Sequence, residues 1–311
     1  MNRKTVALFA VFLAGLLFLG SCATAPQRVL RPPDAAGIEY LPLDPGALAY
    51  MYTDVEAARP ILNRVGLGGV SGRQVEDILD RTQYAAAAVY PPASGQNAQV
   101  VAWGKYPSAG AGFYFAFSKD WKKRKSAAGK SYWYSERNGL SVALNSRQAF
   151  VALGANLDPF AASPGTPSPE GFSEFRRGAA LSLWLDNPAV PLNRFLSEAG
   201  LPLQIPAEQL LISLHPAAPD AEFAAEAGYE AHLRIKTPSP SQARALVTIF
   251  SMARRVSGAA GTGGEIATLL PILFANPPVQ DGAFLNIRTA PMEAGEIALL
   301  FGLFSVYSTQ N

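Results

Sequence analysis

Histidines and carboxylates are side chains from which many metal and catalytic sites are built. The chain has two histidines, His215 and His232, and both fall in stretches that we predict as strands. If these strands pair, the two imidazoles approach each other, and Glu222, Glu226 or Glu230 would complete a ligand set. A histidine in a half-buried strand is more often satisfied by a hydrogen bond, and this spacing resembles no known metal site. We therefore predict no metal and no cofactor.

Serine and glycine motifs also fall short of a catalytic pattern. Gly69-Val70-Ser71-Gly72 lacks the second spaced glycine of a nucleophile elbow. Gly129-Lys130-Ser131 resembles the end of a phosphate-binding loop, but Arg124 stands where the first glycine is needed. The glycines at 261–264 precede a predicted helix and favour a flexible loop over an anion site. We predict no catalytic residue, and hence a protein that is not an enzyme.

One stretch, residues 113–134, combines many aromatic side chains with a cluster of positive charges. Its basic residues are Lys122, Lys123, Arg124, Lys125 and Lys130. Such a cluster produces a local positive field, which favours contact with anionic lipid headgroups, an envelope polymer or an acidic partner. The alternative is an aromatic core face that ends in a solvated, basic helix terminus. Both interpretations remain open on the sequence.

The first 22 residues have the layout of a secretory signal peptide. Arg3 and Lys4 form a positive start, and an apolar run without charge covers Val6 to Leu19. The run is short for a membrane-spanning helix, which needs about 20 apolar residues. The leader ends in Leu19-Gly20-Ser21-Cys22, and Cys22 is the only cysteine of the chain. Intrachain disulfides are therefore excluded.

These four residues resemble the lipobox of bacterial lipoproteins, in which a leucine and two small residues precede a cysteine. The commoner order places alanine or serine before glycine, so Gly20-Ser21 is a variant. The resemblance implies cleavage before Cys22, a diacylglyceryl group on its thiol and acylation, such as with palmitate, of its amine. Two or three acyl chains hold a protein on a bilayer without a spanning helix. The alternatives are a secreted protein with a stray cysteine and an uncleaved anchor helix.

The resemblance also predicts the location of the protein. Ala23 follows Cys22, so the aspartate of the enterobacterial inner-membrane retention signal is missing. We expect a protein that is lipid-anchored in the cell envelope, on the non-cytoplasmic side, with the outer membrane favoured. The leader contains two of the 26 basic residues and none of the 24 acidic ones, so the mature chain is neutral. A neutral body gives no argument for nucleic acid as a partner.

Composition and short internal matches predict the domain organisation. We expect a signal peptide at 1–21 and a Pro- and Ala-rich tether, with the acylated cysteine, at 22–46. Residues 47–54 resemble 180–187, 105–108 resemble 236–239, and 117–118 resemble 250–251, all at nearly one spacing. We interpret these matches as an internal repeat of two units, 47–154 and 179–311, joined by a linker at 155–178.

Each half shows a similar order of strands and helices. In the first half we predict strands at 47–54, 84–90, 98–106, 132–136, 140–145 and 149–153, and helices at 55–65, 75–81 and 109–122. In the second half we predict strands at 180–186, 211–215, 223–236, 283–289 and 296–306, and helices at 192–199, 207–211, 241–256 and 265–274. The order predicts an α+β fold of two tandem ferredoxin-like (βαββαβ) units with mostly antiparallel sheets. The alternative is one continuous α+β domain with a long shared sheet.

The sequence thus predicts an envelope lipoprotein that is a binding or scaffolding module. Its expected partners are the membrane, through the N-terminal lipid, and another envelope protein or polymer. Two other functions remain open: an enzyme that acts on a cell-envelope polymer, and a lipoprotein that binds a small apolar ligand.

Overall fold

The computed structural model describes ten ranges of the chain: 46–65, 72–91, 96–126, 129–137, 139–154, 171–198, 204–217, 228–257, 271–273 and 275–298. These residues contain thirteen strands, and every pair with an assigned register is antiparallel. Contacts divide the chain into two compact units. The N-terminal unit holds the described residues of 3–59 and 66–174, and the C-terminal unit holds those of 60–65 and 175–311.

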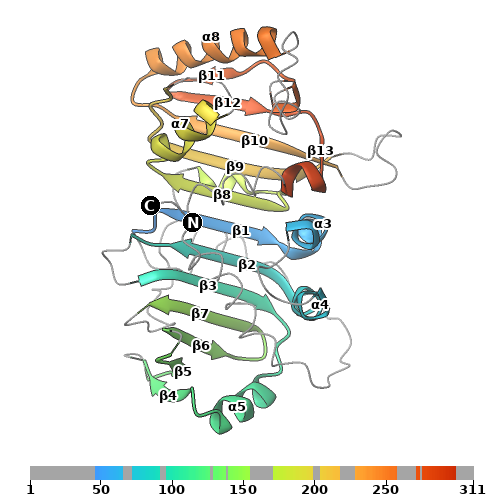
Figure 1. Cartoon of the computed structure of the whole chain (residues 1–311), viewed down its shortest axis with the longest axis vertical. Coiled ribbons are helices and arrows are strands. Elements are labelled where there is room, and N and C mark those ends of the chain that lie inside the picture. Colours follow the sequence, from blue (N-terminus) through green and yellow to red (C-terminus); the bar gives the residue numbers. More distant parts are fainter. Residues whose placement is uncertain are drawn as a thin grey trace. The chain divides into compact units, whose positions relative to one another are not determined.

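The N-terminal unit contains a sheet of seven strands (Figure 1). Their order across the sheet is β1 (Ala49–Asp54), β2 (Thr82–Val89), β3 (Gln96–Gly104), β7 (Gln148–Gly154), β6 (Leu140–Leu144), β5 (Ser131–Ser135) and β4 (Lys122–Lys125). Because β4 has no neighbour beyond β5 in this order, it is an edge strand. The prediction of mostly antiparallel strand pairing is correct for this unit.

Three helices belong to the first half of the chain: α3 (Val55–Val65), α4 (Gly72–Arg81) and α5 (Ser108–Phe117). Helix α3 starts where Asp54 ends β1, because the Asp54 carboxylate accepts a hydrogen bond from the Ala57 amide at 3.2 Å and so caps the helix. Val55, Ala58 and Ile61, three residues apart, form its buried face. The predicted bounds of this helix are correct.

The C-terminal unit contains strands in the order β11 (Val279–Asp281), β12 (Phe284–Arg288), β10 (Gly228–Lys236), β9 (Gln209–Pro216) and β8 (Leu181–Asp186). A short strand, β13 (Met292–Glu293), also pairs with β10. The helices are α7 (Ala189–Glu198) and α8 (Pro240–Ser257), while the single turn α6 (Phe172–Phe175) lies within the segment predicted as a linker.

One face of this C-terminal sheet carries the core of the unit. Leu210, Ile235 and Leu285 lie opposite one another on β9, β10 and β12, and all three are fully buried. Leu192 of α7 and the buried side of α8 belong to the same hydrophobic cluster. Because alternate strand residues point to opposite faces, the other face carries the odd-numbered residues of β9 and the even-numbered residues of β10 and β12.

The ferredoxin-like prediction is wrong, because strands that follow each other in sequence pair directly. In that fold a helix connects two parallel strands, whereas here β8 pairs antiparallel with β9 although α7 lies between them in sequence. In the same way β10 pairs antiparallel with β12 across α8. The predicted order of elements was compatible with both arrangements, since an inserted helix does not determine which strand edge the chain returns to.

Three local predictions are also wrong. The helix predicted over 109–122 ends at Phe117, and Lys122 lies in strand β4 with residues 123–125. Residues 209–211 begin strand β9, where a helix was predicted. Residues 296–298 belong to a helical stretch, 294–298, where a strand was predicted. The predicted leader, the tether through residue 45 and the linker residues 155–170 lie outside the described residues. Among the helices that the structure describes, none combines the length and apolarity needed to span a membrane.

Candidate functional site

The basic run forms the edge strand β4, on which all four side chains are exposed. Its pairing with β5 sets Lys122 opposite Tyr134 and Lys123 opposite Trp133. Because strand residues alternate, Lys123 and Lys125 lie on the face of Trp133, and Lys122 and Arg124 lie on the other. The four charges are therefore divided two and two between the faces of the sheet.

On the second face a single carboxylate neutralises much of the positive charge. Lys122 Nζ donates a hydrogen bond to Glu136 Oε1 at 3.0 Å, and Arg124 Nη2 lies 3.5 Å from the same oxygen. The guanidinium of Arg124 also stacks 3.9 Å from the centre of the Tyr134 ring. The hydrogen bond from Lys122, with the positive charges of Lys122 and Arg124, holds the pKa of Glu136 below its ordinary value.

On the first face, helix α5 packs its central aromatic residue against the sheet. Phe115 is 2% exposed and lies 4.7 Å from the Trp121 ring and 5.8 Å from the Trp133 ring, centre to centre. Phe113 and Phe117 are 69% and 75% exposed, with ring centres 4.5 Å apart. Residues four apart are neighbours on a helix, so these two rings form one exposed aromatic pair.

Lys123 and Lys125 make no ion pair with any residue in the described ranges, and Lys123 Nζ lies 6.0 Å from the centre of the Trp133 ring. We call Phe113, Phe117, Lys123 and Lys125 the edge patch. Helix α5, which carries the exposed apolar pair, contacts strand β4, which carries the two unneutralised lysines. Apolar and basic side chains are combined in this way on surfaces that contact anionic bilayers.

The sequence analysis singled out the whole aromatic and basic stretch, but it named only the cations as contact residues. Lys130 lies at the end of the β4–β5 turn, where its amide donates to Ser126 Oγ at 3.0 Å. Aromatic residues at 113, 115 and 117 were the available signal, since three such positions on one short helix cannot all face the same core.

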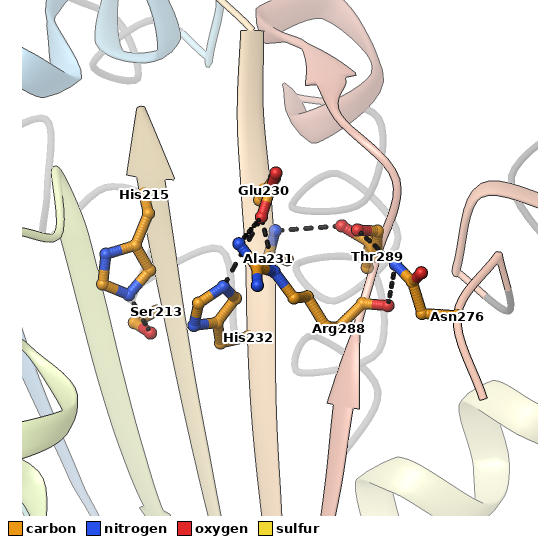
Figure 2. Close-up of polar contacts among 8 residues, drawn as sticks. All are labelled: Ser213, His215, Glu230, Ala231, His232, Asn276, Arg288 and Thr289. Carbon is orange, nitrogen blue, oxygen red and sulfur yellow. Dashed lines mark hydrogen bonds and ion pairs between the residues drawn. The ribbon is translucent and has the colours of Figure 1, made fainter. Parts of the chain in front are cut away.

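A second polar cluster lies on β9, β10 and β12, on the face opposite the hydrophobic core (Figure 2). It consists of Ser213, His215, Glu230, His232 and Arg288. The register places His232 opposite both Ser213 and Arg288, and His215 opposite Glu230. The imidazole rings of His215 and His232 are 4.4 Å apart, centre to centre, and tilted by 33°. The strands thus bring together the two histidines, as expected if their strands paired.

Arg288 binds the only carboxylate in this cluster. Its Nε and Nη2 atoms lie 2.6 and 2.5 Å from Glu230 Oε2, and His232 Nε2 lies 3.7 Å from the same oxygen. The lone pair of an imidazole nitrogen lies in the plane of its ring, so these two rings, which face each other, do not direct their lone pairs to one metal position. The described residues contain no group of three ligands that could hold a metal ion. Glu222 and Glu226 lie outside these residues.

Ser213 and His215 have the contact expected of a nucleophile and its base. The distance from Ser213 Oγ to His215 Nε2 is 2.9 Å. Ser213 is fully buried, however, so a substrate cannot reach its hydroxyl. We interpret this contact as a structural hydrogen bond.

Comparisons with known proteins support a lipoprotein of the envelope. Residues 38–159, less than half of the chain, match the model of the family described as outer membrane-associated lipoprotein TP0453. No curated protein matches the chain. The internal repeat gains no support from the family match.

Solved structures of TP0453 have a similar fold. Its crystal form III is 18% identical, with a TM-score of 0.55 over 87% of this chain and 98% of that one. Crystal form IV is 17% identical, with a TM-score of 0.55 over 86% and 96%. Crystal form I is 17% identical, with a TM-score of 0.53 over 88% and 98%. At this identity the likeness shows the fold, while the family match confirms the predicted location: a lipid-anchored protein of the cell envelope, with the outer membrane favoured.

Proposed function

We propose that this protein is a non-enzymatic envelope lipoprotein whose folded body docks on an anionic membrane surface through the edge patch. The observation that carries the proposal is the exposed pair Phe113 and Phe117 on α5, a helix that contacts the strand of Lys123 and Lys125. These two lysines have no carboxylate partner among the described residues. The proposal keeps the predicted role of the aromatic and basic stretch, and it adds Phe113 and Phe117 to the contact residues.

The two kinds of side chain make complementary contributions to membrane binding. Full burial of a phenylalanine side chain contributes about 1.5–3 kcal/mol. Each lysine near an anionic surface contributes about 1 kcal/mol, and salt weakens this term. If the phenylalanine rings insert below the headgroups while the lysines lie at the level of the phosphates, the apolar and the electrostatic contributions act together.

The predicted anchor makes weak docking sufficient. A tether of the predicted length, residues 22–46, extends at most about 80 Å, which allows the body to reach the membrane that holds Cys22. The lipid keeps the body at a high effective concentration near that surface, so the patch needs little affinity of its own. The similarity to an outer membrane-associated lipoprotein family supports this setting.

Tryptophan quenching tests the proposal directly, because Trp121 and Trp133 lie close to α5. The acylated full-length protein is reconstituted into vesicles that contain brominated phospholipids, with or without anionic lipid. We expect quenching that increases with anionic lipid and decreases with salt. The double substitutions Phe113→Ala with Phe117→Ala, and Lys123→Ala with Lys125→Ala, should each reduce it at least threefold.

The matched control replaces one exposed cation and one exposed apolar residue in the C-terminal unit, Arg244→Ala with Val279→Ala. This control should quench like the wild type. Quenching that ignores lipid charge and both patch variants would refute membrane docking. If the patch variants instead lose an envelope protein or polymer that co-purifies with the wild type, the patch has that partner and the membrane proposal is wrong.

A further inference from the structure

We propose that Ser213, His215, Glu230, His232 and Arg288 form an acid-sensitive latch, which holds β9, β10 and β12 together at neutral pH and loosens them when both histidines are protonated. We call these five residues the histidine latch. The inference is independent of the edge patch, since it concerns a different unit.

The first argument is the distance between the two imidazoles. With ring centres 4.4 Å apart and a tilt of 33°, the two rings lie in contact. Ser213 Oγ holds His215 in place through its hydrogen bond to Nε2 (Figure 2). Two positive imidazolium rings at this distance repel each other. The geometry therefore accommodates two neutral histidines better than two charged ones.

The second argument is the balance of charge around the pair. Glu230 supplies the carboxylate of the histidine latch, and Arg288 already binds this carboxylate through two nitrogen atoms. Protonation of both histidines would set three cations against one anion. His232 Nε2 is buried and has no hydrogen-bond partner among the described residues. It lies 3.7 Å from Glu230 Oε2, farther than Arg288 Nε at 2.6 Å.

Other groups on this face of the described strands do not bring a second anion to the two histidines. On β10, Arg234 adds another positive charge and turns to Asp281 of β11, at 3.7 Å, and to the Phe284 ring of β12. Ser182 of β8, opposite Ser213, is neutral. Glu293 of β13 is exposed and lies opposite Gly228, away from both imidazoles in register.

The pKa directions agree with this geometry. Burial lowers the pKa of both histidines below 6.5, and the positive charge of Arg288 lowers them further. His215 adds to the lowering of the pKa of His232. The opposite influences are a backbone hydrogen bond with Gly178, which raises the pKa of His215, and the charge of Glu230, which raises both pKa values. A histidine whose pKa is lowered by folding stabilises the fold above pH 6.5, and this stability is lost as the pH falls through the lowered pKa.

The histidine latch lies beside the hydrogen bonds that join β10 to the residues directly after β12. The Thr289 amide donates to the Ala231 carbonyl at 3.0 Å, and the Ala231 amide donates to Thr289 Oγ1 at 2.9 Å. Asn276 Nδ2 donates to the carbonyls of Arg288 and Thr289 at 3.1 and 3.2 Å. Loosening at His232 would therefore release β12 and β13 from β10 before it affected the N-terminal unit.

Hydrogen exchange measured by mass spectrometry tests this inference on the acylated full-length protein in detergent micelles. Amide protection, corrected for the intrinsic pH dependence of exchange, is compared at pH 7.5 and pH 5.0. We expect protection of residues 228–236 and 284–293 to fall at least tenfold more than that of β2 and β3. The double substitution His215→Gln with His232→Gln should abolish this difference, and the control Asp80→Asn should not.

Two results would overturn the inference: equal loss of protection in the glutamine variant, or no selective loss in the wild type. If the double variant does not fold at pH 7.5, NMR titration of the histidine rings in the wild type decides. Two linked titrations, both with midpoints below 6.5, would support the latch. Independent titrations, or midpoints at or above 6.5, would refute it.

Discussion

Glu136 accepts a hydrogen bond from Lys122 across the β4–β5 pair, with a distance of 3.0 Å between the carboxylate oxygen and Nζ. Both side chains are exposed, so the contact contributes little to stability. Its consequence is electrostatic, because it reduces the positive charge of one face of the edge strand and leaves Lys123 and Lys125 on the other. Because of Glu136, the positive charge of β4 that has no carboxylate partner among the described residues is that of Lys123 and Lys125.

The substitution Glu136→Gln should strengthen binding to anionic vesicles. Removal of the carboxylate leaves one more net positive charge near the surface, and a charge of this kind contributes about 1 kcal/mol, or roughly fivefold in affinity. Vesicle sedimentation at low and high salt measures the effect, which should shrink at high salt. Glu208→Gln, an exposed glutamate in the C-terminal unit, serves as the control and should change nothing. Equal affinity for Glu136→Gln and wild type at low salt would contradict the prediction.

Gly104 cannot carry a side chain without moving the backbone. A Cβ atom at this position would lie 1.9 Å from the carbonyl oxygen of Arg81, where β2 begins beside the end of β3. We expect Gly104→Ala to lower the free energy of unfolding by about 2 kcal/mol or more, measured by urea denaturation. Gly112→Ala is the matched control, because its Cβ meets no atom within 4 Å and alanine favours a helix. A neutral Gly104→Ala would show that the strands separate easily there.

Asn193 joins helix α7 to the segment that leads into β9. Its Oδ1 accepts a hydrogen bond from the Ile205 amide at 2.5 Å, and its Nδ2 donates to the Ile205 carbonyl at 3.3 Å. Ile205 is fully buried, so Asn193→Ala leaves both backbone groups without this partner and should cost roughly 1–3 kcal/mol. The same denaturation assay checks the value, with the exposed Gln204→Ala as reference. A loss no larger than that of the reference would mean that water replaces the side chain.

Cys22 is the predicted site of acylation. The substitution Cys22→Ala should abolish incorporation of labelled palmitate and leave the leader uncleaved. Because the body lies far along the chain from residue 22, its circular dichroism should not change. Label that persists in the variant, or is missing from the wild type, would show that the chain is not a lipoprotein of the predicted kind.

Local sequence was sufficient where a short range of residues controls the structure. Helix α3 agrees with its predicted bounds because Asp54 caps it and Val55, Ala58 and Ile61 repeat at helical spacing. The two strands of the first hairpin, β2 and β3, were predicted from apolar runs bounded by prolines. The basic residues of the edge patch were visible as a cluster, although their placement at a helix end was wrong.

The sequence by itself determined most of the segments that become strands or helices, that the mature chain is neutral, and that the leader resembles a lipoprotein signal. Only the tertiary structure decided how the strands pair, since the return of β9 to β8 around α7 depends on contacts between residues far apart in the chain. The same long-range pairing brings His215 within 4.4 Å of His232. It also sets Phe115 against Trp133, so that Phe113 and Phe117, on the same helix, remain exposed. Periodicity encodes which residues share a face, whereas the partner of that face is chosen by packing across the whole fold.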